Sequence, residues 1–206
     1  MRRTHHVAAA AAGSDSTAGS GGATGAVTYT MDPGHTEVLA TWNHFGFSKP
    51  AAMFYQVRGS ITYDPARPEA ASVEVTIPVA SLHTTVPKQD AHLQSAEFFD
   101  AEKFPDIHFV STRVARGAAP GKLQVTGDLR VHGVTRPVTL DVTVNQVGNH
   151  PMHNVQAAGF DAVAHLNRSD FGVGAHVPLV SDRIDLRITT EAVESTAWEV
   201  IRRQFE

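Results

Sequence analysis

Apolar and polar residues alternate with a period of two through most of the chain after Val27. Regular alternation covers 73–79, 138–144 and 184–188, and noisier alternation covers 38–47, 54–63, 107–114, 122–131 and 159–166. Turn residues separate these stretches at intervals of roughly ten residues. The pattern predicts eight or nine antiparallel strands, each with one buried and one solvated face. An up-and-down barrel or a sandwich would fit that number, and a barrel leaves no exposed sheet edge.

One segment inside the strand region lacks this alternation. The segment 87–100 carries Ala and Glu and places Leu93, Ala96 and Phe99 near one helical face. We expect it to form one or two helical turns inserted between two strands.

A second helix is predicted at the C-terminal end, over 196–206. Thr196 and Glu199 match a capping box, and Trp198, Ile201 and Phe205 form an apolar stripe. A helix of about eleven residues is marginally stable by itself. We therefore expect it to dock on the strand domain or on a partner.

Composition indicates a single globular domain. The chain has 206 residues, of which 42% are hydrophobic and 18% charged, and its formal net charge is -4. No basic stripe favours binding to nucleic acid or to an anionic membrane surface. The absence of cysteine excludes disulfides, thiolate metal sites and thiol catalysis, and it leaves the redox compartment undecided.

The first 26 residues are set apart by their composition. A basic start is followed by a short apolar run over 7–12 and by a tract of Gly, Ser, Ala and Thr. This run is too short to span a bilayer and shorter than the core of a usual signal peptide. We interpret 1–26 as the remnant of a secretory leader or as a disordered linker, and we expect the folded domain to begin at residue 27.

Metal-binding and catalytic motifs are weak. His150 and His153 flank a turn and His5 and His6 are adjacent, but the other histidines are scattered among strands, so no metal site is expected. The Gly-x-Ser-x-Gly pattern of serine hydrolases is absent after Val27. No catalytic residue is assigned, although His92 with a nearby carboxylate keeps acid–base chemistry open as an alternative.

Aromatic residues are more numerous near strand ends and in the insertion than strand interiors require. An eight-stranded barrel is just wide enough to be filled by side chains or to hold one ligand, and the pattern alone leaves both readings open. If a ligand tunnel exists, its candidate walls are Trp42, Phe45, Phe47, Phe54, Phe98, Phe99, Phe109, Phe160 and Phe171.

Four sequence blocks, taken in order, resemble the signature blocks of the YceI-like family. They are TYTMDPGHTEVLATWNHFGFS, DAHLQSAEFFDAEKFPDIHF, VTGDLRVHGVTRPVTLDV and NRSDFGVGAHVPLVSDRIDLRITTEA. The resemblance implies an all-β fold over 27–195: an antiparallel, eight-stranded, lipocalin-like barrel with a short helical insertion. The C-terminal helix expected over 196–206 goes beyond the usual end of the family. The resemblance also implies an interior tunnel that holds a polyisoprenoid chain, such as that of an isoprenoid quinone or another prenyl lipid.

The same resemblance implies residues for the mouth of the tunnel. The polar residues carried over as head-group contacts are His44, Asp90, His92, Arg168 and Asp170. An alternative for the last two is an ion pair that fixes the loop before Gly172. Phe98 and Phe99 are interpreted as a lid over the tunnel.

Two other matching residues suggest backbone geometry instead of ligand contact. Gly133 and Pro137 are interpreted as hairpin residues, with Gly133 supplying permissive dihedral angles and Pro137 beginning a strand. One departure from the family lies at Asn43, where many members carry a basic residue.

The leading hypothesis is a non-enzymatic protein, periplasmic or secreted, that sequesters or carries a long isoprenoid lipid and uses no catalytic cofactor. A homodimer and a membrane cytochrome of the b561 type are the protein partners that the resemblance allows. The alternatives are a stress-related module that works with such a cytochrome through the C-terminal helix, and an enzyme that processes a small amphiphile with His92 and Asp90.

Overall fold

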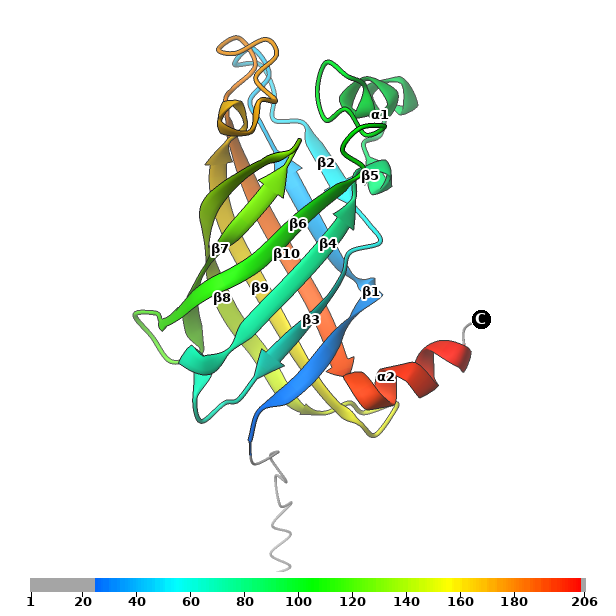
Figure 1. Ribbon diagram of the computed structural model, residues 1–206, viewed down its shortest axis with the longest axis vertical. Helices are drawn as coiled ribbons and strands as arrows, with labels where there is room; N and C mark the ends of the chain where they lie inside the picture. Colours follow the sequence, from blue (N-terminus) through cyan, green and yellow to red (C-terminus); the bar gives the residue numbers. More distant parts are fainter. Residues whose placement is uncertain (1–24, 205–206) are drawn as a thin grey trace, which may run out of the picture.

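The computed structural model describes residues 25–204, so the predicted leader or linker over 1–26 lies almost entirely outside the described residues. Within these residues, ten strands and two α-helices follow one another (Figure 1). The strands are β1 Val27–Thr41, β2 Ala51–Phe54, β3 Arg58–Tyr63, β4 Ser72–Pro78, β5 Leu82–His83, β6 Asp106–Arg116, β7 Lys122–Val131, β8 Val134–Asn149, β9 Gln156–Asn167 and β10 Arg183–Glu194. The helices are α1 Pro87–Gln94 and α2 Ser195–Ile201.

The sheet closes on itself to form a barrel. Neighbouring strands pair antiparallel in the order β10-β9-β8-β7-β6-β4-β3-β1, and β10 also pairs with β1 along most of its length. These eight strands form the closed wall, which confirms the predicted eight-stranded antiparallel barrel over the alternative of a sandwich. Closure satisfies the backbone groups that the two edges of an open sheet would expose.

The two remaining strands extend the wall at one end. β3 pairs with the first part of β1 and β2 pairs with its last part. β4 pairs with β3 and β5 pairs with β2, so the β2–β5 pair extends the wall beyond the β3–β4 pair, and each strand is interrupted between the two pairs. One break falls where Gln56 adopts a positive φ of 54°. The other follows Pro78, which lacks a backbone N–H and leads into a short 3-10 helix, Val79–Ser81.

Alternation along the strands sets which side chains enter the barrel. In β9, Ala158, Phe160 and Ala162 are buried, whereas Val163 is 52% exposed on the outer surface. The period of two in the sequence therefore corresponds to an apolar inner face and an outer face in water. At roughly 25 cal/mol per Å² of apolar area removed from water, this inner face is the main favourable contribution to folding.

The strand register slips at three places, in β1, β6 and β8. The largest slip lies between Met31 and Thr36, where the residues from Asp32 to His35 have no register partner on β10. Bulges of this kind sharpen strand bending and help a sheet to curl into a barrel. This one lies on the seam where the first and last strands meet.

The β7–β8 hairpin bears out one prediction and corrects another. His132 and Gly133 both have positive φ, 52° and 75°, and they connect the paired residues Val131 and Val134 in a two-residue turn, as expected for Gly133. Pro137, however, lies inside β8 opposite Asp128. It is tolerated because β9 begins to pair with β8 only at Asp141, so the missing N–H interrupts no ladder on that side.

The helices differ in detail from the predictions. α1 ends at Gln94, and the rest of the insertion consists of turns. α2 begins at Ser195, one residue earlier than predicted, and the capping box is not formed: the Thr196 hydroxyl donates to the Glu194 carboxylate instead. Ile201 is buried and Trp198 half-buried, as the stripe requires, whereas Phe205 lies outside the described residues.

Within residues 25–204, the helices lack the length and apolar character needed to cross a membrane.

Candidate functional site: a two-chamber cavity inside the barrel

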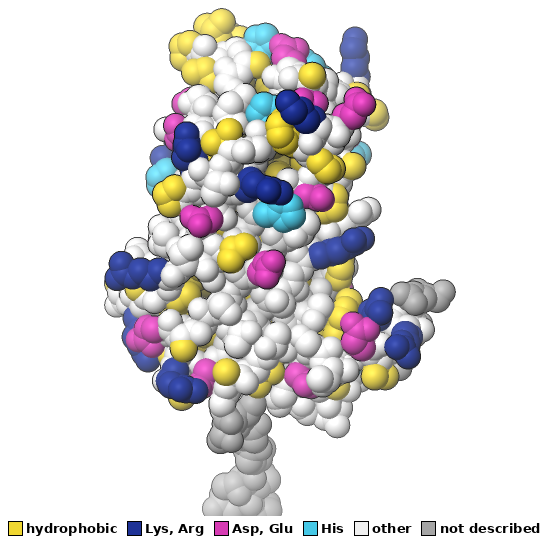
Figure 2. All heavy atoms as spheres, in the orientation of Figure 1, with side chains coloured by type: hydrophobic (Ala, Val, Ile, Leu, Met, Phe, Trp, Pro, Cys, Tyr) yellow, Lys and Arg dark blue, Asp and Glu magenta, His cyan; other side chains and the backbone are white. Residues whose placement is uncertain are grey.

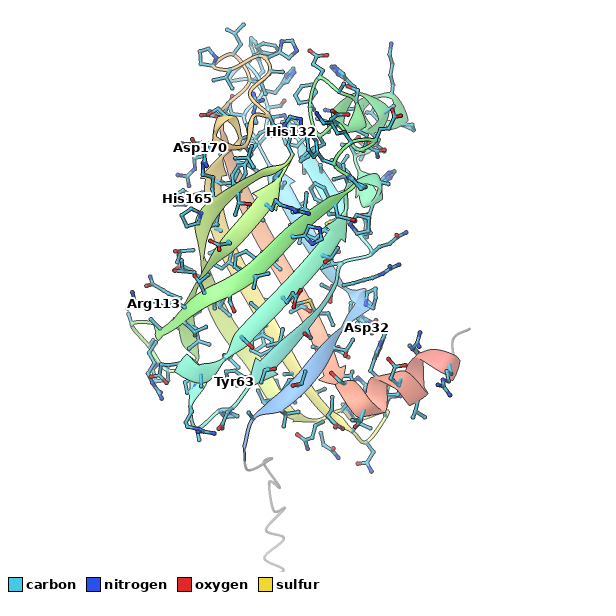
Figure 3. The ribbon with its side chains drawn as sticks, viewed as in Figure 1. Asp32, Tyr63, Arg113, His132, His165 and Asp170 are labelled. Carbon is cyan, nitrogen blue, oxygen red and sulfur yellow. The ribbon has the colours of Figure 1, made fainter. Side chains whose placement is uncertain are left out.

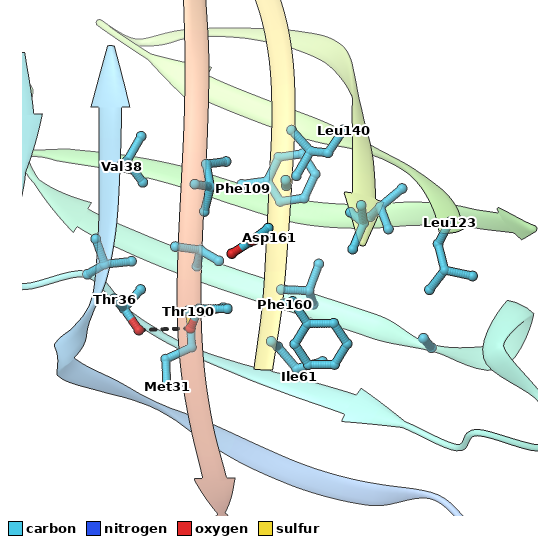
Figure 4. A pocket seen from close by; sticks show the side chains of 18 of the residues that line it. Met31, Thr36, Val38, Ile61, Phe109, Leu123, Leu140, Phe160, Asp161 and Thr190 are labelled. Atoms are coloured by element: carbon cyan, nitrogen blue, oxygen red, sulfur yellow. Dashed lines mark hydrogen bonds between the residues drawn. The ribbon is translucent and has the colours of Figure 1, made fainter. Parts of the chain in front are cut away.

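The barrel encloses two adjoining apolar chambers. The upper chamber, of about 430 Å³, lies under α1 and the loop after β9. The lower chamber, of about 150 Å³, lies in the middle of the strands and is shown in Figure 4. Leu129 lines both chambers, so they meet at its side chain. The histidines that line the cavity, His44, His92 and His176, all lie around the upper chamber.

The lower chamber is lined almost completely by aliphatic and aromatic side chains. In Figure 4, Phe109 lies beside Leu140 in the upper part of the view, Phe160 lies beside Ile61 in the lower part, and Leu123 lies to the right. An apolar cavity of about 150 Å³ stays dry and takes up apolar molecules, because water inside it would lack hydrogen-bond partners. The lower chamber is therefore suited to a hydrocarbon chain.

Gly127 allows Phe109 to lie against β7. A Cβ at this position would come 2.5 Å from the Phe109 ring and 2.5 Å from the Val110 carbonyl oxygen, and real Cβ atoms do not approach other atoms so closely. The close packing fixes the Phe109 ring in the wall of the lower chamber. It gives a physical reason for one of the glycines in the third sequence block.

The structure places eight of the nine predicted wall residues around the chambers. Phe109 and Phe160 line the lower chamber. The upper chamber is lined by Trp42, Phe45, Phe54, Phe98, Phe99 and Phe171. Phe47 must be corrected: it is 93% exposed and lines neither chamber, because it sits at the tip of a tight turn after β1 that points away from the barrel.

The insertion covers the upper chamber through its phenylalanines. Phe99 packs edge-on against Phe54 of β2, with ring centroids 5.9 Å apart. Phe98 contacts the His92 ring edge-on at 5.0 Å and lies 6.2 Å from the His176 ring. The aromatic pair FF in the second sequence block thus connects the insertion to the barrel wall on one side and to the loop after β9 on the other.

A polar bridge joins the same two segments. One oxygen of Glu97 lies 2.7 Å from His92 Nε2, and its other oxygen lies 3.1 Å from His176 Nε2. The hydrogen bond from His92, the largest cause, and the charge of both histidines hold the pKa of Glu97 below its usual value. Sequence reasoning missed the roles of Glu97 and His176, because nothing in local spacing connects two residues so far apart along the chain.

Asp90 and His92 do not form a pair. The Asp90 carboxylate accepts hydrogen bonds from the Thr84 N–H at 2.7 Å and the Thr84 hydroxyl at 2.5 Å, and it lies 2.9 Å from His83 Nδ1. The Thr84 hydroxyl is the largest cause of the lowered pKa of Asp90. His92 lines the upper chamber but Asp90 does not, which corrects the head-group role of Asp90: it anchors α1 to the preceding strand.

Arg168 is buried and holds backbone. Its guanidinium donates to four carbonyl oxygens, those of Val173 (2.7 Å), Ala175 (2.8 Å), Ser181 (2.9 Å) and Val180 (3.0 Å). Burial lowers the pKa of Arg168. Because four of its five N–H donors are used in this way, its main role is to fix the loop 172–182.

Asp170 is exposed and takes no part in that network. It lies at the upper end of the barrel (Figure 3), in the 3-10 helix Arg168–Phe171, outside the lining of the upper chamber. The expected Arg168–Asp170 ion pair is not formed in the described structure, and the head-group role of Asp170 is corrected as well. The carboxylate that braces this turn is Asp182, which accepts from the Ser169 N–H and hydroxyl at 2.8 and 2.6 Å.

The rim of the upper chamber carries exposed apolar side chains on two neighbouring loops. Phe45 is 48% exposed, Phe47 93%, Val177 37% and Leu179 67%. The loops are joined by a hydrogen bond from the Phe45 N–H to the Leu179 carbonyl at 3.2 Å. Figure 2 shows apolar side chains gathered at this end of the molecule, whereas acidic and basic side chains are dispersed over the barrel wall. We call these four residues the apolar rim.

A closed, eight-stranded antiparallel barrel with an apolar interior cavity and a partly covered mouth defines the class of lipocalin-like barrels, whose interior is wide enough for one ligand. The chain belongs to the YceI-like domain family, whose model matches residues 29–192. A UPF0312 protein of Pseudomonas putida is 37% identical over 174 residues, which cover 82% of this chain and 88% of that one. A UPF0312 protein of Pseudomonas syringae pv. tomato is 38% identical over 152 residues, or 74% of this chain and 78% of that one.

Solved structures share the barrel. BcnA of Burkholderia cenocepacia superposes with a TM-score of 0.71 at 27% identity, covering 79% of this chain and 99% of that one. The YceI protein of Campylobacter jejuni gives a TM-score of 0.66 at 31% identity, covering 74% and 89%. A polyisoprenoid-binding domain of Saccharophagus degradans gives a TM-score of 0.62 at 9% identity, covering 82% and 99%, a likeness of fold alone.

Proposed function

We propose that this protein binds one long-chain isoprenoid lipid, with the chain in the two chambers and the head group at the mouth, and that it sequesters or carries this lipid without catalysis. The observation that carries the proposal is the lower chamber: a dry, apolar space beyond the upper chamber, deep in the barrel. Such a space contributes to the binding of a ligand only if the ligand has a hydrocarbon tail long enough to pass Leu129.

The energetics favour a long chain over a small amphiphile. Each buried methylene contributes roughly 0.8 kcal/mol, so each five-carbon isoprene unit in the lower chamber adds several kcal/mol before the costs of ordering the chain. The upper chamber, at about 430 Å³, lies in the range of ordinary small-molecule sites. The Saccharophagus degradans domain, described as polyisoprenoid-binding, supports this choice of ligand through its fold.

The polar residues at the upper chamber supply contacts for a head group. His44, Gln89, His92 and His176 line this end, and their side chains offer donors and acceptors. Oxygen atoms of a quinone ring would find N–H donors there. His92 stays a predicted head-group contact, and His44 does too, whereas Arg168 has one guanidinium N–H left beyond its loop contacts.

A non-catalytic role agrees with the polar groups of the insertion. Asp90 is engaged by Thr84 and His83, so the acid–base pair with His92 that an enzyme was expected to use does not form. A periplasmic or secreted location, a homodimer and a cytochrome partner stay predictions.

The proposal is tested by narrowing the lower chamber. Ala162→Phe places a ring in the lower chamber, whereas Val163→Phe, one residue later, places the same ring on the outer surface of β9. We expect Ala162→Phe to weaken the binding of a long polyprenyl quinone at least about tenfold, equivalent to about 1.4 kcal/mol, and to leave a short-chain quinone unaffected. Fluorescence titration of both ligands against both variants measures this.

The matched variant makes the outcome interpretable. Val163→Phe should bind both quinones like the unaltered chain. Equal affinities of Ala162→Phe and Val163→Phe for the long quinone, with both variants folded by circular dichroism, would mean that the chain does not reach the lower chamber and would overturn the proposal.

A further inference from the structure

A cluster of metal-ligating side chains lies at the closure seam, far from the mouth of the tunnel. Asp32 and His35 belong to the β1 bulge, and Glu191 lies opposite on β10. One ligand atom from each of these three residues lies within 4.8 Å of the others. His35 Nδ1 is 2.7 Å from Asp32 Oδ2. Figure 3 shows Asp32 on the β1 side of the barrel, near the end that carries α2 and away from His132 and Asp170.

A fourth ligand group comes from the β8–β9 loop. His150 Nε2 lies 3.1 Å from Glu191 Oε1, and the side chain of His150 is only 16% exposed. His153 packs beside His150, with ring centroids 4.7 Å apart. His35, Glu191 and His150 all line one surface hollow of about 700 Å³, so an ion and its water ligands have access. Three separate segments therefore contribute: β1 supplies Asp32 and His35, β10 supplies Glu191, and the β8–β9 loop places His150 next to Glu191.

The chemistry of this donor set fits a divalent transition metal. Zn²⁺ takes imidazole nitrogen and carboxylate oxygen at about 2.0–2.2 Å, so two of its tetrahedral ligand atoms lie roughly 3.3–3.6 Å apart. Rotation of the exposed His35 side chain, on a segment without register partners on β10, would bring ligand atoms that now lie within 4.8 Å of one another to this spacing. The two carboxylates together neutralise the positive charge of a divalent cation. Imidazole ligands favour zinc over calcium or magnesium, which prefer oxygen ligands.

We propose that Asp32, His35, Glu191 and His150 form a binding site for one divalent transition-metal ion of the zinc class. The site joins β1 to β10 where the ladder between them is interrupted. It would therefore act as a staple across the seam that closes the barrel.

The site is also adjacent to the lower chamber. Thr36 and Thr190 line both the surface hollow and the lower chamber, and their hydroxyls are hydrogen-bonded to each other at 2.8 Å. A metal ion at the cluster thus lies on the outer side of a wall whose inner side faces the hydrocarbon chain. The metal-site proposal does not depend on the identity of the lipid, because the four metal-ligating residues line neither chamber and are separated from the lower chamber by this wall.

The test uses the untagged full chain after treatment with a chelator, with zinc chloride as the probe in isothermal titration calorimetry. We expect one saturable Zn²⁺ per chain, and we expect His35→Ala and Glu191→Gln each to weaken it at least about a hundredfold. His165→Ala, which removes an exposed histidine of β9, is the matched control and should bind like the unaltered chain. The double variant His5→Ala/His6→Ala controls for binding by the N-terminal histidine pair and should also leave the site intact.

A second measurement guards against loss of folding. Co²⁺ bound to the full chain should give the visible absorption of a tetrahedral nitrogen–oxygen site, and Asp32→Ala should abolish it while circular dichroism stays unchanged. Zinc binding that persists in His35→Ala and Glu191→Gln, disappears in the His5/His6 variant, or does not saturate at one ion per chain would overturn the proposal.

Discussion

Individual charged residues near the tunnel mostly hold the protein backbone. Arg168 uses four N–H groups on carbonyl oxygens of one loop, and Asp90 accepts from Thr84 and His83 at the start of the insertion. Both residues lie in the sequence blocks that match the family, and such a match fits a ligand contact as well as a structural role. Their hydrogen bonds instead explain why the two segments that cover the upper chamber keep one arrangement.

The role of Arg168 is testable by a substitution that keeps its charge. Arg168→Lys retains the cation but loses the planar set of donors, so several buried carbonyls lose their partner. We expect the free energy of unfolding to fall by about 3 kcal/mol, measured by urea denaturation. Arg183→Lys, at an exposed ion pair with Asp185, is the control and should change stability by less than about 0.5 kcal/mol. An equal, small effect for both variants would contradict the structural role of Arg168.

Sequence patterns could predict the residues that the barrel buries but not the partners of its polar groups. Period-two alternation identified Ala162, Phe160 and their neighbours as strand residues because burial on one face of a strand leaves a local signature. The Glu97–His176 contact and the Asp32–His35–Glu191 cluster leave none, since each depends on how distant segments meet. Phe47 was assigned to the wall because an aromatic side chain in a turn looks the same whether it points inward or outward.

At the scale of elements, the insertion after β5 and the loop after β9 form a two-part cover. The β-barrel wall is fixed by continuous ladders, whereas these two segments meet through Phe98 and through the bridge from Glu97 to His92 and His176. All three bridge residues are about half exposed, so the bridge is weak enough to open. An opening of this cover is the expected route for the ligand.

The bridge has a defined pH dependence. Because the folded-state pKa of Glu97 is lowered, its contribution is fully present above the usual glutamate value of 4.5 and is lost as the pH falls through the lower folded-state value. We expect faster hydrogen exchange of the amides of 95–104 on acidification below about pH 4.5, measured by mass spectrometry. Glu97→Gln should exchange fast already at neutral pH and lose this pH response. Identical exchange profiles for the two chains would contradict the bridge.

The apolar rim predicts how the ligand is acquired. The exposed Phe47 and Leu179 lie on two loops that are joined through Phe45, and exposed apolar side chains there favour contact with lipid at the chamber mouth. We expect Phe47→Ser to slow uptake of a polyprenyl quinone from neutral phosphatidylcholine vesicles several-fold while its affinity for detergent-dispersed quinone stays unchanged. Met152→Ser, which removes another highly exposed apolar side chain, from the β8–β9 loop, should have no effect. Uptake rates that fall equally in both variants would argue against the rim.

At the scale of the whole molecule, closure of the barrel depends on its first and last strands. β1 pairs with β10 on both sides of the bulge, so the seam forms only when the two ends of the domain have come together. Alternation and turn spacing predicted eight or nine antiparallel strands, where the described residues form ten, and the family resemblance predicted the eight-stranded barrel. The chambers were not predictable, because the same alternation fits a barrel that side chains fill completely. Space inside the barrel requires small residues on the inner face, such as Ala162 in the wall of the lower chamber.

The central claim is that one isoprenoid lipid occupies the interior of the barrel. Native mass spectrometry of the untagged chain, purified from its own source without detergent, tests it most directly, with organic extraction to identify the released molecule. We expect one prenyl lipid per chain, lost on extraction and regained when a polyprenyl quinone is added. Repeated recovery of an empty chain that takes up no added polyprenyl quinone would contradict it.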